Sequence, residues 1–336
     1  MGSINLSIVI TTYKENEHIK RILTEISYLK ESNISYEIIL LDASDFQKED
    51  AEKLLKNKSK FLTFISSPGL SRTKSLNKIF NLAVGELIVR LDARSSIPDD
   101  YIDKIYTLYK SSDAEVVGGS MKPIGTSKSQ KVVANLMSHP LCFGGSRSRD
   151  LNHTGYVDSV YLGAFSNSFL KKNKLYFDGI HPDISEDSDL NYRINKCGGK
   201  IYQDSSIFIN HYPRENLKDF FKLCFNYGVG RGIFVIKHRN FMFKRQLVPP
   251  IAFLLSKISN KYTIVAFIYF INVALYTIFE TSEPPPDFNP FELDNVGDFI
   301  DYNRFIISVV WQKIITLISM LSILIFTFGY RRLIND

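Results

Sequence analysis

Cysteine is scarce in this sequence, and several familiar site motifs are missing. The three cysteines, Cys142, Cys197 and Cys224, lie far apart, and no two of them have metal-ligand spacing. Their odd number argues against a disulfide framework, so we expect a reducing compartment and cysteines that serve as small core residues. No glycine-rich loop ends in Lys-Ser or Lys-Thr. That absence argues against a phosphoryl or nucleotidyl transferase of the P-loop type.

The N-terminus lacks the pattern of a cleavable leader. Residues 1–5 form a short, uncharged segment, and the apolar run 6–12 is too brief for the core of a signal peptide. We therefore expect the first part of the chain to start in the cytosol and to stay there.

Charge and aromatic content do not favour a nucleic-acid partner. The net charge of +6 is mild, and a phosphate-rich substrate or an anionic membrane surface explains it equally well. Tyrosine and phenylalanine are abundant but scattered, which is typical of a core. The basic stretch 144–149 is interpreted as a solvated loop beside the active site.

Strand and helix patterns alternate in the first part of the chain. The sequence predicts strands at 7–10, 37–41, 61–65 and 86–91, and helices at 17–30, 48–57 and 71–83. Alternation of this kind favours parallel pairing in a doubly wound α/β sheet. Such sheets bind ligands beyond the carboxyl ends of their strands, so the functional residues are expected there.

After residue 245 the chain becomes apolar. Residues 262–280 and 305–328 are long enough, or nearly so, to cross a hydrocarbon core of roughly 30 Å, whereas 247–258 contains Pro249-Pro250 and is predicted to be interfacial. Residues 281–303 carry many acids, and Lys and Arg flank the apolar region, so the positive-inside rule places both ends in the cytosol. The alternative is a pair of buried helices in a soluble domain.

This pattern divides the chain into two predicted domains. Residues 1–240 form a cytoplasmic catalytic domain, and residues 241–336 form a membrane-associated region.

Polar residues follow the first two predicted strands. The run from Thr11 to Asn16 leaves the sheet where a helix begins, which suits a diphosphate or a nucleobase, although Thr and Asn also cap helices. Asp42 ends the second strand and is a candidate for binding a base or a ribose, or else a turn residue.

Two further segments carry acids. Asp92-Ala93-Arg94 follows an apolar strand, and residues at positions i and i+2 point the same way in an extended chain. Two oxygen ligands so placed could hold a divalent ion, but here the second group is Arg94. Glu186-Asp187 stands at the start of a predicted helix and is either a general base for an acceptor hydroxyl or a helix start favoured by the dipole.

In their order and spacing these segments resemble the family 2 glycosyltransferases with the GT-A fold. The ordered set is the end of the first strand, Asp42, the helix that ends at Ala83-x-Gly85, Asp92-Ala93-Arg94 and Glu186-Asp187. Residues 131–140, 144–149, 157–165 and 226–231 are similar to the succinoglycan glucosyltransferase subgroup. The resemblance covers almost the whole chain, and it implies an α/β GT-A fold, the doubly wound mixed sheet of nucleotide-diphospho-sugar transferases, with C-terminal membrane helices.

The resemblance also implies roles for individual residues. Asp187 would be the catalytic base, with Glu186 beside it. The acceptor side would include Tyr161, Gly163 and Ala164. The residues implied to bind the donor are Thr11, Thr12, Tyr13, Glu15, Asp42, Arg72, Asp92, Arg94 and Arg231, with Arg214 as a further candidate for the leaving diphosphate.

The second acid of the family's metal motif is replaced by Arg94, which has no lone pair for a cation. We favour a retained Mg²⁺ or Mn²⁺ bound through Asp92, with His211 as a second ligand. In the alternative, Arg94 itself supplies positive charge to the diphosphate, and His211 is an ordinary polar residue near a strand end.

The implied function is inverting transfer of a hexose or an N-acetylhexosamine. The donor would be a nucleotide-sugar, with a UDP-sugar favoured, and the acceptor a polyprenyl-diphosphate-linked or other glycan at the cell membrane, in exopolysaccharide, capsule or other surface-glycan synthesis. Processive synthases usually carry a Gln-x-x-Arg-Trp motif, and the single tryptophan, Trp311, lies in the tail, so we expect one sugar per encounter. A non-catalytic, nucleotide-sugar-binding membrane scaffold of an assembly complex is the alternative.

Overall fold

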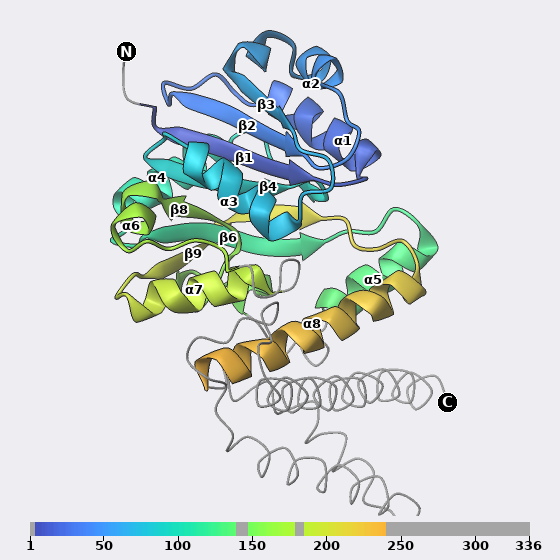
Figure 1. The fold of residues 1–336 in the computed structure, drawn as a ribbon, viewed down its shortest axis with the longest axis vertical. Coiled ribbons are helices and arrows are strands. Elements are labelled where there is room, and N and C mark those ends of the chain that lie inside the picture. Colours follow the sequence, from blue (N-terminus) through green and yellow to red (C-terminus); the bar gives the residue numbers. More distant parts are fainter. Residues whose placement is uncertain (1–3, 139–146, 179–184, 240–336) are drawn as a thin grey trace, which may run out of the picture. The chain divides into compact units, whose positions relative to one another are not determined.

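The computed structural model describes residues 4–138, 147–178 and 185–239 (Figure 1). The chain divides into two compact units, Met1–Leu217 and Lys218–Asp336. The second unit is described only within helix α8 (Leu217–His238) and the residue after it. None of the helices in the described ranges is both long and apolar enough to span a bilayer.

The predicted membrane region falls outside these ranges. The interfacial segment 247–258 and the spans 262–280 and 305–328 therefore stay predictions, as does the domain boundary at residue 240.

The first unit contains a mixed nine-stranded sheet in the order β3-β2-β1-β4-β8-β6-β9-β5, with β7 beside β9 (Figure 1). The strands are β1 (Leu6–Thr12), β2 (Tyr36–Asp42), β3 (Leu62–Ser66), β4 (Leu87–Asp92), β5 (Ser95–Ser96), β6 (Val116–Pro123), β7 (Gly155–Tyr156), β8 (Tyr161–Ser166) and β9 (Ile201–His211). The first four strands are parallel, as predicted. Strand β8 is antiparallel to both of its neighbours, β4 and β6, which makes the sheet mixed.

Helices cover both faces of this sheet. They are α1 (Asn16–Ser27), α2 (Lys48–Leu55), α3 (Arg72–Leu82), α4 (Tyr101–Ser111), α5 (Lys128–Ser138), α6 (Asn167–Lys172) and α7 (Glu186–Lys196), with 3-10 turns η1 (Lys56–Phe61) and η2 (Arg147–Arg149). The helix predicted at 48–57 ends at Leu55 because Lys56 has a positive φ of 54°, which an α-helix does not accommodate.

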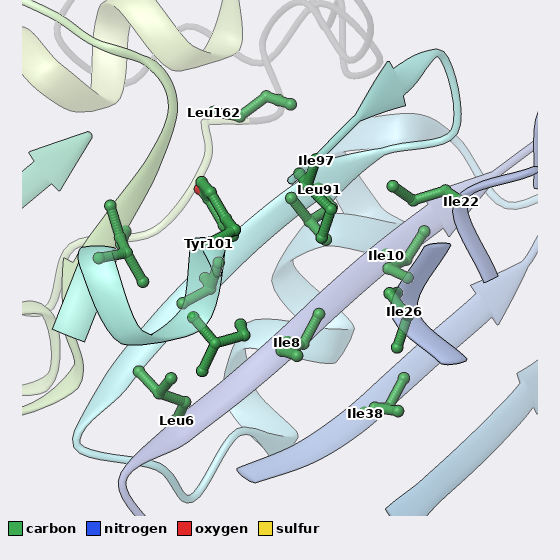
Figure 2. Packing of buried hydrophobic residues seen from close by; sticks show 14 of the residues in the cluster. Leu6, Ile8, Ile10, Ile22, Ile26, Ile38, Leu91, Ile97, Tyr101 and Leu162 are labelled. Atoms are coloured by element: carbon green, nitrogen blue, oxygen red, sulfur yellow. The ribbon is translucent and has the colours of Figure 1, made fainter. Parts of the chain in front are cut away.

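The hydrophobic core has two halves, one on each side of the sheet. Leu6, Ile8 and Ile10 of β1 pack with Ile22 and Ile26 of α1 (Figure 2). The intervening residues of the strands face the other half, which contains Val9 and Ile88 and apolar residues of α3, α6 and α7. Because side chains alternate along a strand, Arg90 and Asp92 of β4 share the face of Ile88, beneath α3 and α7.

The β6–β9 pair is packed too closely for a side chain at Gly119. A Cβ atom there would lie 1.9 Å from the carbonyl oxygen of Ile207, and the register of the pair shifts between Gly118 and Ser120. This pairing brings the end of β9 beside β5, where His211 faces Ser95. The chain after β4 and the chain after β9 therefore meet at one edge of the sheet.

Candidate active site

The carboxyl ends of three parallel strands form one row of polar residues. Thr12 pairs in register with Asp42, and Thr11 pairs with Asp92. The β5–β9 pairing adds His211 to this edge. Residues that are far apart in sequence therefore gather where a doubly wound sheet binds its ligand.

Asp42 is buried and closes a tight loop. Its Oδ2 accepts hydrogen bonds from the backbone N–H of Ser44 at 2.8 Å and of Phe46 at 3.0 Å, and its Oδ1 accepts one from Ser44 Oγ at 2.9 Å. The structure thus shows that Asp42 acts as a turn residue, which is one of the two roles that the sequence allows for it. Its contact with a donor stays a prediction. Thr12 lies beside it with a buried Oγ1 that has no hydrogen-bond partner among the described residues, while Tyr13 is exposed.

Four charged side chains connect the end of β4 with the starts of α3 and α7. Arg72 donates from Nη2 to Asp92 Oδ2 at 3.0 Å and from Nε to Glu186 Oε1 at 2.9 Å. Arg90 lies beneath them, with Nη2 3.2 Å from Glu186 Oε1 and 3.5 Å from Asp92 Oδ1. This β4–α3–α7 charge cluster holds the two helix starts over the strand end.

The cluster keeps both of its acids ionised. Burial acts to raise the pKa of Asp92, but the charges of Arg72 and Arg90 outweigh it and lower the pKa to about 2. The same balance between burial and the two arginines lowers the pKa of Glu186. Glu186 is therefore a buried carboxylate that tethers α7, and it is poorly suited to accept a proton near neutral pH.

Asp187 has the opposite environment from its neighbour. Ser185 adopts a left-handed conformation with φ 59°, and α7 then begins with Glu186 buried and Asp187 exposed. Asp187 Oδ1 accepts a hydrogen bond from the backbone N–H of Ser188 at 2.8 Å. Its Oδ2 has no hydrogen bond to the described part of the chain. A solvent-facing carboxylate next to this charge cluster can receive a proton from a bound hydroxyl.

A second charged group is built on Glu15. Arg94 donates from Nε to Glu15 Oε1 at 2.9 Å, and Arg214 donates from Nη1 to the same oxygen at 3.4 Å. Arg94 Nη1 also donates to the carbonyl oxygen of Pro213 at 3.4 Å. We call these three side chains the Glu15–arginine group. It joins the loop after β1 to the loops after β4 and β9.

His211 is held neutral beside this group. Burial lowers its pKa to about 3, Asp92 opposes that shift, and Arg149, Arg94 and Arg214 add to it. Its Nδ1 forms a hydrogen bond with the hydroxyl of Tyr161 at 2.8 Å. The predicted acceptor-side residue Tyr161 therefore touches the site.

The other two residues predicted for the acceptor side lie inside the sheet. Ala164 is fully buried and pairs with Val89 and Val117. A Cβ atom at Gly163 would lie 2.9 Å from a methyl group of Val116. In this structure both residues are surrounded by protein, and their contact with an acceptor stays a prediction.

The residues expected to hold Mg²⁺ or Mn²⁺ do not form a suitable ligand set. Across the described ranges, no group of three or more His, Cys, Asp or Glu residues could hold a metal ion. The carboxylate of Asp92 faces two guanidinium groups, and His211 Nδ1 is engaged by Tyr161. Arg94 stands at the second ligand position and cannot ligate a cation. The predicted metal therefore enters no step of the proposed mechanism.

Arg90 is a site residue that is not among the predicted ones. An arginine inside an apolar strand is itself a signal, because a buried cation requires a partner. Arg149 in η2 is close enough to lower the pKa of His211. The sequence marks Arg149 only as part of the basic stretch 144–149, which is predicted to lie beside the active site. Arg231 lies on α8, and its side chain is outside what the structure describes.

The mixed α/β sheet, with charged residues at its carboxyl edge, has the GT-A fold. The fold is similar to S. aureus TarS 1-349 in complex with UDP, with a TM-score of 0.51, 14% identity, and coverage of 93% of this chain and 90% of that one. The TarS complex with UDP-GlcNAc gives a TM-score of 0.52, with the same identity and coverage.

Sequence comparison places the chain in a family. Residues 7–173 match the glycosyl transferase family 2 model, and the protein is a family 2 glycosyltransferase. It is 26% identical to the succinoglycan biosynthesis protein ExoA of Rhizobium meliloti, over 75% of this chain and 78% of that protein. It is 24% identical to a dolichyl N-acetyl-alpha-D-glucosaminyl phosphate 3-beta-D-2,3-diacetamido-2,3-dideoxy-beta-D-glucuronosyltransferase of Methanococcus voltae, over 83% of this chain and 89% of that enzyme.

Proposed function

We propose that this enzyme transfers a hexose or an N-acetylhexosamine from a UDP-sugar to a lipid-linked glycan acceptor, with inversion at the anomeric carbon. The observation that carries the proposal is the contrast at the start of α7, where Glu186 is buried and paired and Asp187 is exposed beside the cluster. The TarS complexes with UDP and UDP-GlcNAc support a uridine nucleotide. The names of the two relatives support polysaccharide synthesis and a lipid-phosphate-linked acceptor.

The reaction is a single in-line displacement. Asp187 takes the proton of an acceptor hydroxyl while that oxygen forms a bond to the anomeric carbon. The bond between the anomeric carbon and the β-phosphate oxygen breaks, and UDP leaves from the opposite face with the electron pair. An α-linked donor therefore yields a β-linked product. Arg72, Arg94 and Arg214 lie at the edge where negative charge grows on the leaving phosphate.

The acceptor is proposed to be held at the cell membrane. The apolar region after residue 245 and its basic flanks support this location, since a basic segment is attracted to anionic headgroups. The catalytic domain then faces the cytoplasm, where nucleotide-sugars are made.

Replacement of Asp187 tests the proposal. Asp187→Asn is expected to lower the transfer rate by about 10²–10⁴-fold because a general base is lost. UDP affinity should stay within about threefold, since Asp187 makes no ion pair with the described arginines. Transfer to lipid-linked acceptors from radiolabelled UDP-sugars, together with calorimetric titration of UDP, measures both effects.

A matched control is Asp50→Asn, an exposed acid on α2. It should retain the rate of the unmodified enzyme. Turnover near the unmodified rate in Asp187→Asn would remove the assignment of the base.

The altered metal motif at Arg94 also favours a second candidate, a non-catalytic binder of nucleotide-sugars. The exposed Asp187 argues for catalysis instead. Purified protein that binds UDP but neither hydrolyses nor transfers UDP-sugars, across many acceptors, would support the binder.

A further inference from the structure

We infer that the Glu15–arginine group replaces the divalent cation in this enzyme, so that Arg94 and Arg214 bind the donor diphosphate directly and neither donor binding nor transfer requires a metal. This inference rests on the proposed function, since it concerns the diphosphate of a nucleotide-sugar.

Glu15 holds the two guanidinium groups close to each other. Both donate to one oxygen of Glu15, and Arg94 is held further by the carbonyl of Pro213. The side chains of Arg94 and Glu15 are only 20% and 18% exposed. Arg94 is therefore held in place by the protein before a ligand arrives, which reduces the entropy lost on binding, and the more exposed Arg214 shares its carboxylate partner.

Among the described residues, both arginines keep N–H donors that no protein group uses. Arg94 uses Nε and Nη1, and Arg214 uses Nη1, in hydrogen bonds to the described part of the chain. Arg94 Nη2 and Arg214 Nε and Nη2 make none there. These three nitrogens are available to phosphate oxygens, and the planar guanidinium fork suits phosphate geometry.

The ion-paired groups at this edge carry more positive than negative charge. The ion pairs at this edge contain four arginines, Arg72, Arg90, Arg94 and Arg214, against three carboxylates, Glu15, Asp92 and Glu186. These ion-paired groups therefore carry one excess positive charge, counted without Asp42, Asp187 and Arg149. A diphosphate neutralises that excess, whereas a divalent cation increases it.

The residues at this edge form a poor ligand set for a cation. Mg²⁺ requires near-octahedral coordination by oxygen atoms. Asp92 is engaged by two guanidinium groups, and the position two residues later presents another. The same position in the chain that would have held the metal now supplies the positive charge.

The test measures UDP binding by the purified full chain in detergent, by calorimetry, in EDTA and in Mn²⁺. The dissociation constants of the unmodified protein are expected to agree within about threefold. Arg94→Ala should weaken UDP binding by about 10- to 100-fold in both conditions, since a charged hydrogen-bond donor is lost. Arg94→Lys should recover part of the loss. The matched control is Arg193→Ala, which removes an arginine that pairs with Asp189 on α7, and it should not change the affinity.

A charge-reversal variant sharpens the test. Arg94→Asp removes a guanidinium group and adds a carboxylate. Its UDP binding should be weak in EDTA and should stay weak on addition of Mn²⁺, because Arg72 and Arg90 still engage Asp92.

The outcomes separate the inference from the proposed function. If the unmodified protein binds UDP only in the presence of Mn²⁺, the inference is overturned and the proposed function stands. Unchanged UDP affinity in a folded Arg94→Ala variant would have the same consequence. No binding of UDP in either condition, by protein with a cooperative melting transition, would overturn the proposed donor. If Arg94→Ala does not fold, the comparison of EDTA with Mn²⁺ on the unmodified protein and the Arg214→Ala variant decide the matter.

Discussion

Arg90 and the adjacent acids of α7 show how single residues define this site. Arg90 is 4% exposed and lies in an otherwise apolar part of β4. Its buried charge is stabilised by ion pairs with the carboxylates of Glu186 and Asp92. In turn, the charge of Arg90 helps to lower the pKa values of these two acids. Glu186 and Asp187 are neighbours in sequence, yet one is a buried tether and the other an exposed base candidate.

Arg90→Met is expected to lower the free energy of unfolding by about 2–4 kcal/mol, because it leaves a buried carboxylate with one fewer partner. Chemical denaturation measures the change. Because Arg90 acts on Glu186, the double variant Arg90→Met/Glu186→Gln should lose less stability than the sum of the two single variants, with a coupling of about 1–3 kcal/mol. Strict additivity would show that the two side chains do not interact.

At the scale of elements, the site depends on where helices begin and on one close strand pair. Helices α3 and α7 start above the end of β4, so Arg72 and Glu186 reach Asp92 and Arg90. Strands β6 and β9 approach each other closely at Gly119, and the end of β9 places His211 at the edge of the sheet that carries the site. The arrangement of the site is thus a property of backbone packing as well as of side chains.

Gly119→Ala should therefore affect both stability and ligand binding. Its Cβ atom would overlap the carbonyl of Ile207, which predicts a loss of about 3 kcal/mol in the free energy of unfolding, measured by chemical denaturation. UDP affinity, measured by calorimetry, should fall as well, because β9 carries the chain to Arg214.

The control for this variant is Gly69→Ala. Gly69 has a positive φ of 76°, but no other atom lies within 4 Å of the place that a Cβ atom would occupy. A loss of only about 1 kcal/mol is therefore expected, with unchanged UDP affinity. Equal losses in the two variants would contradict the role of the close β6–β9 contact.

At the scale of the whole molecule, the enzyme combines a GT-A catalytic unit with an apolar C-terminal region. The first unit, Met1–Leu217, contains every residue of the two charged groups. The composition after residue 245 predicts attachment to a bilayer.

The full chain is expected to stay in the membrane fraction after a carbonate wash, because carbonate removes proteins held by charge alone but not those that span the bilayer. Immunoblots of pellet and supernatant measure this, with one peripheral and one integral membrane protein as standards. Quantitative release into the supernatant would contradict the predicted spans.

Much of the fold and part of the site could be predicted from the sequence. Apolar runs with the period of a strand or a helix predict the first four strands and three helices, because local burial produces that periodicity. Asp42 and Asp92 could be placed at strand ends for the same reason. Strand β8 could not be placed, since antiparallel insertion between β4 and β6 leaves no local pattern.

The sequence by itself determined the family of this protein, its alternation of strands and helices, and the candidate acids at the strand ends, because these depend on local order and spacing along the chain. Only the tertiary structure decided which charges neutralise one another. Arg72, Arg90 and Glu186 form one cluster and Arg94, Arg214 and Glu15 another because helix starts and loops distant in sequence converge at one sheet edge. Burial gives Glu186 and Asp187 different roles, because a buried charge requires partners and an exposed one does not. Glu186 is therefore a tether, and Asp187 is a candidate base.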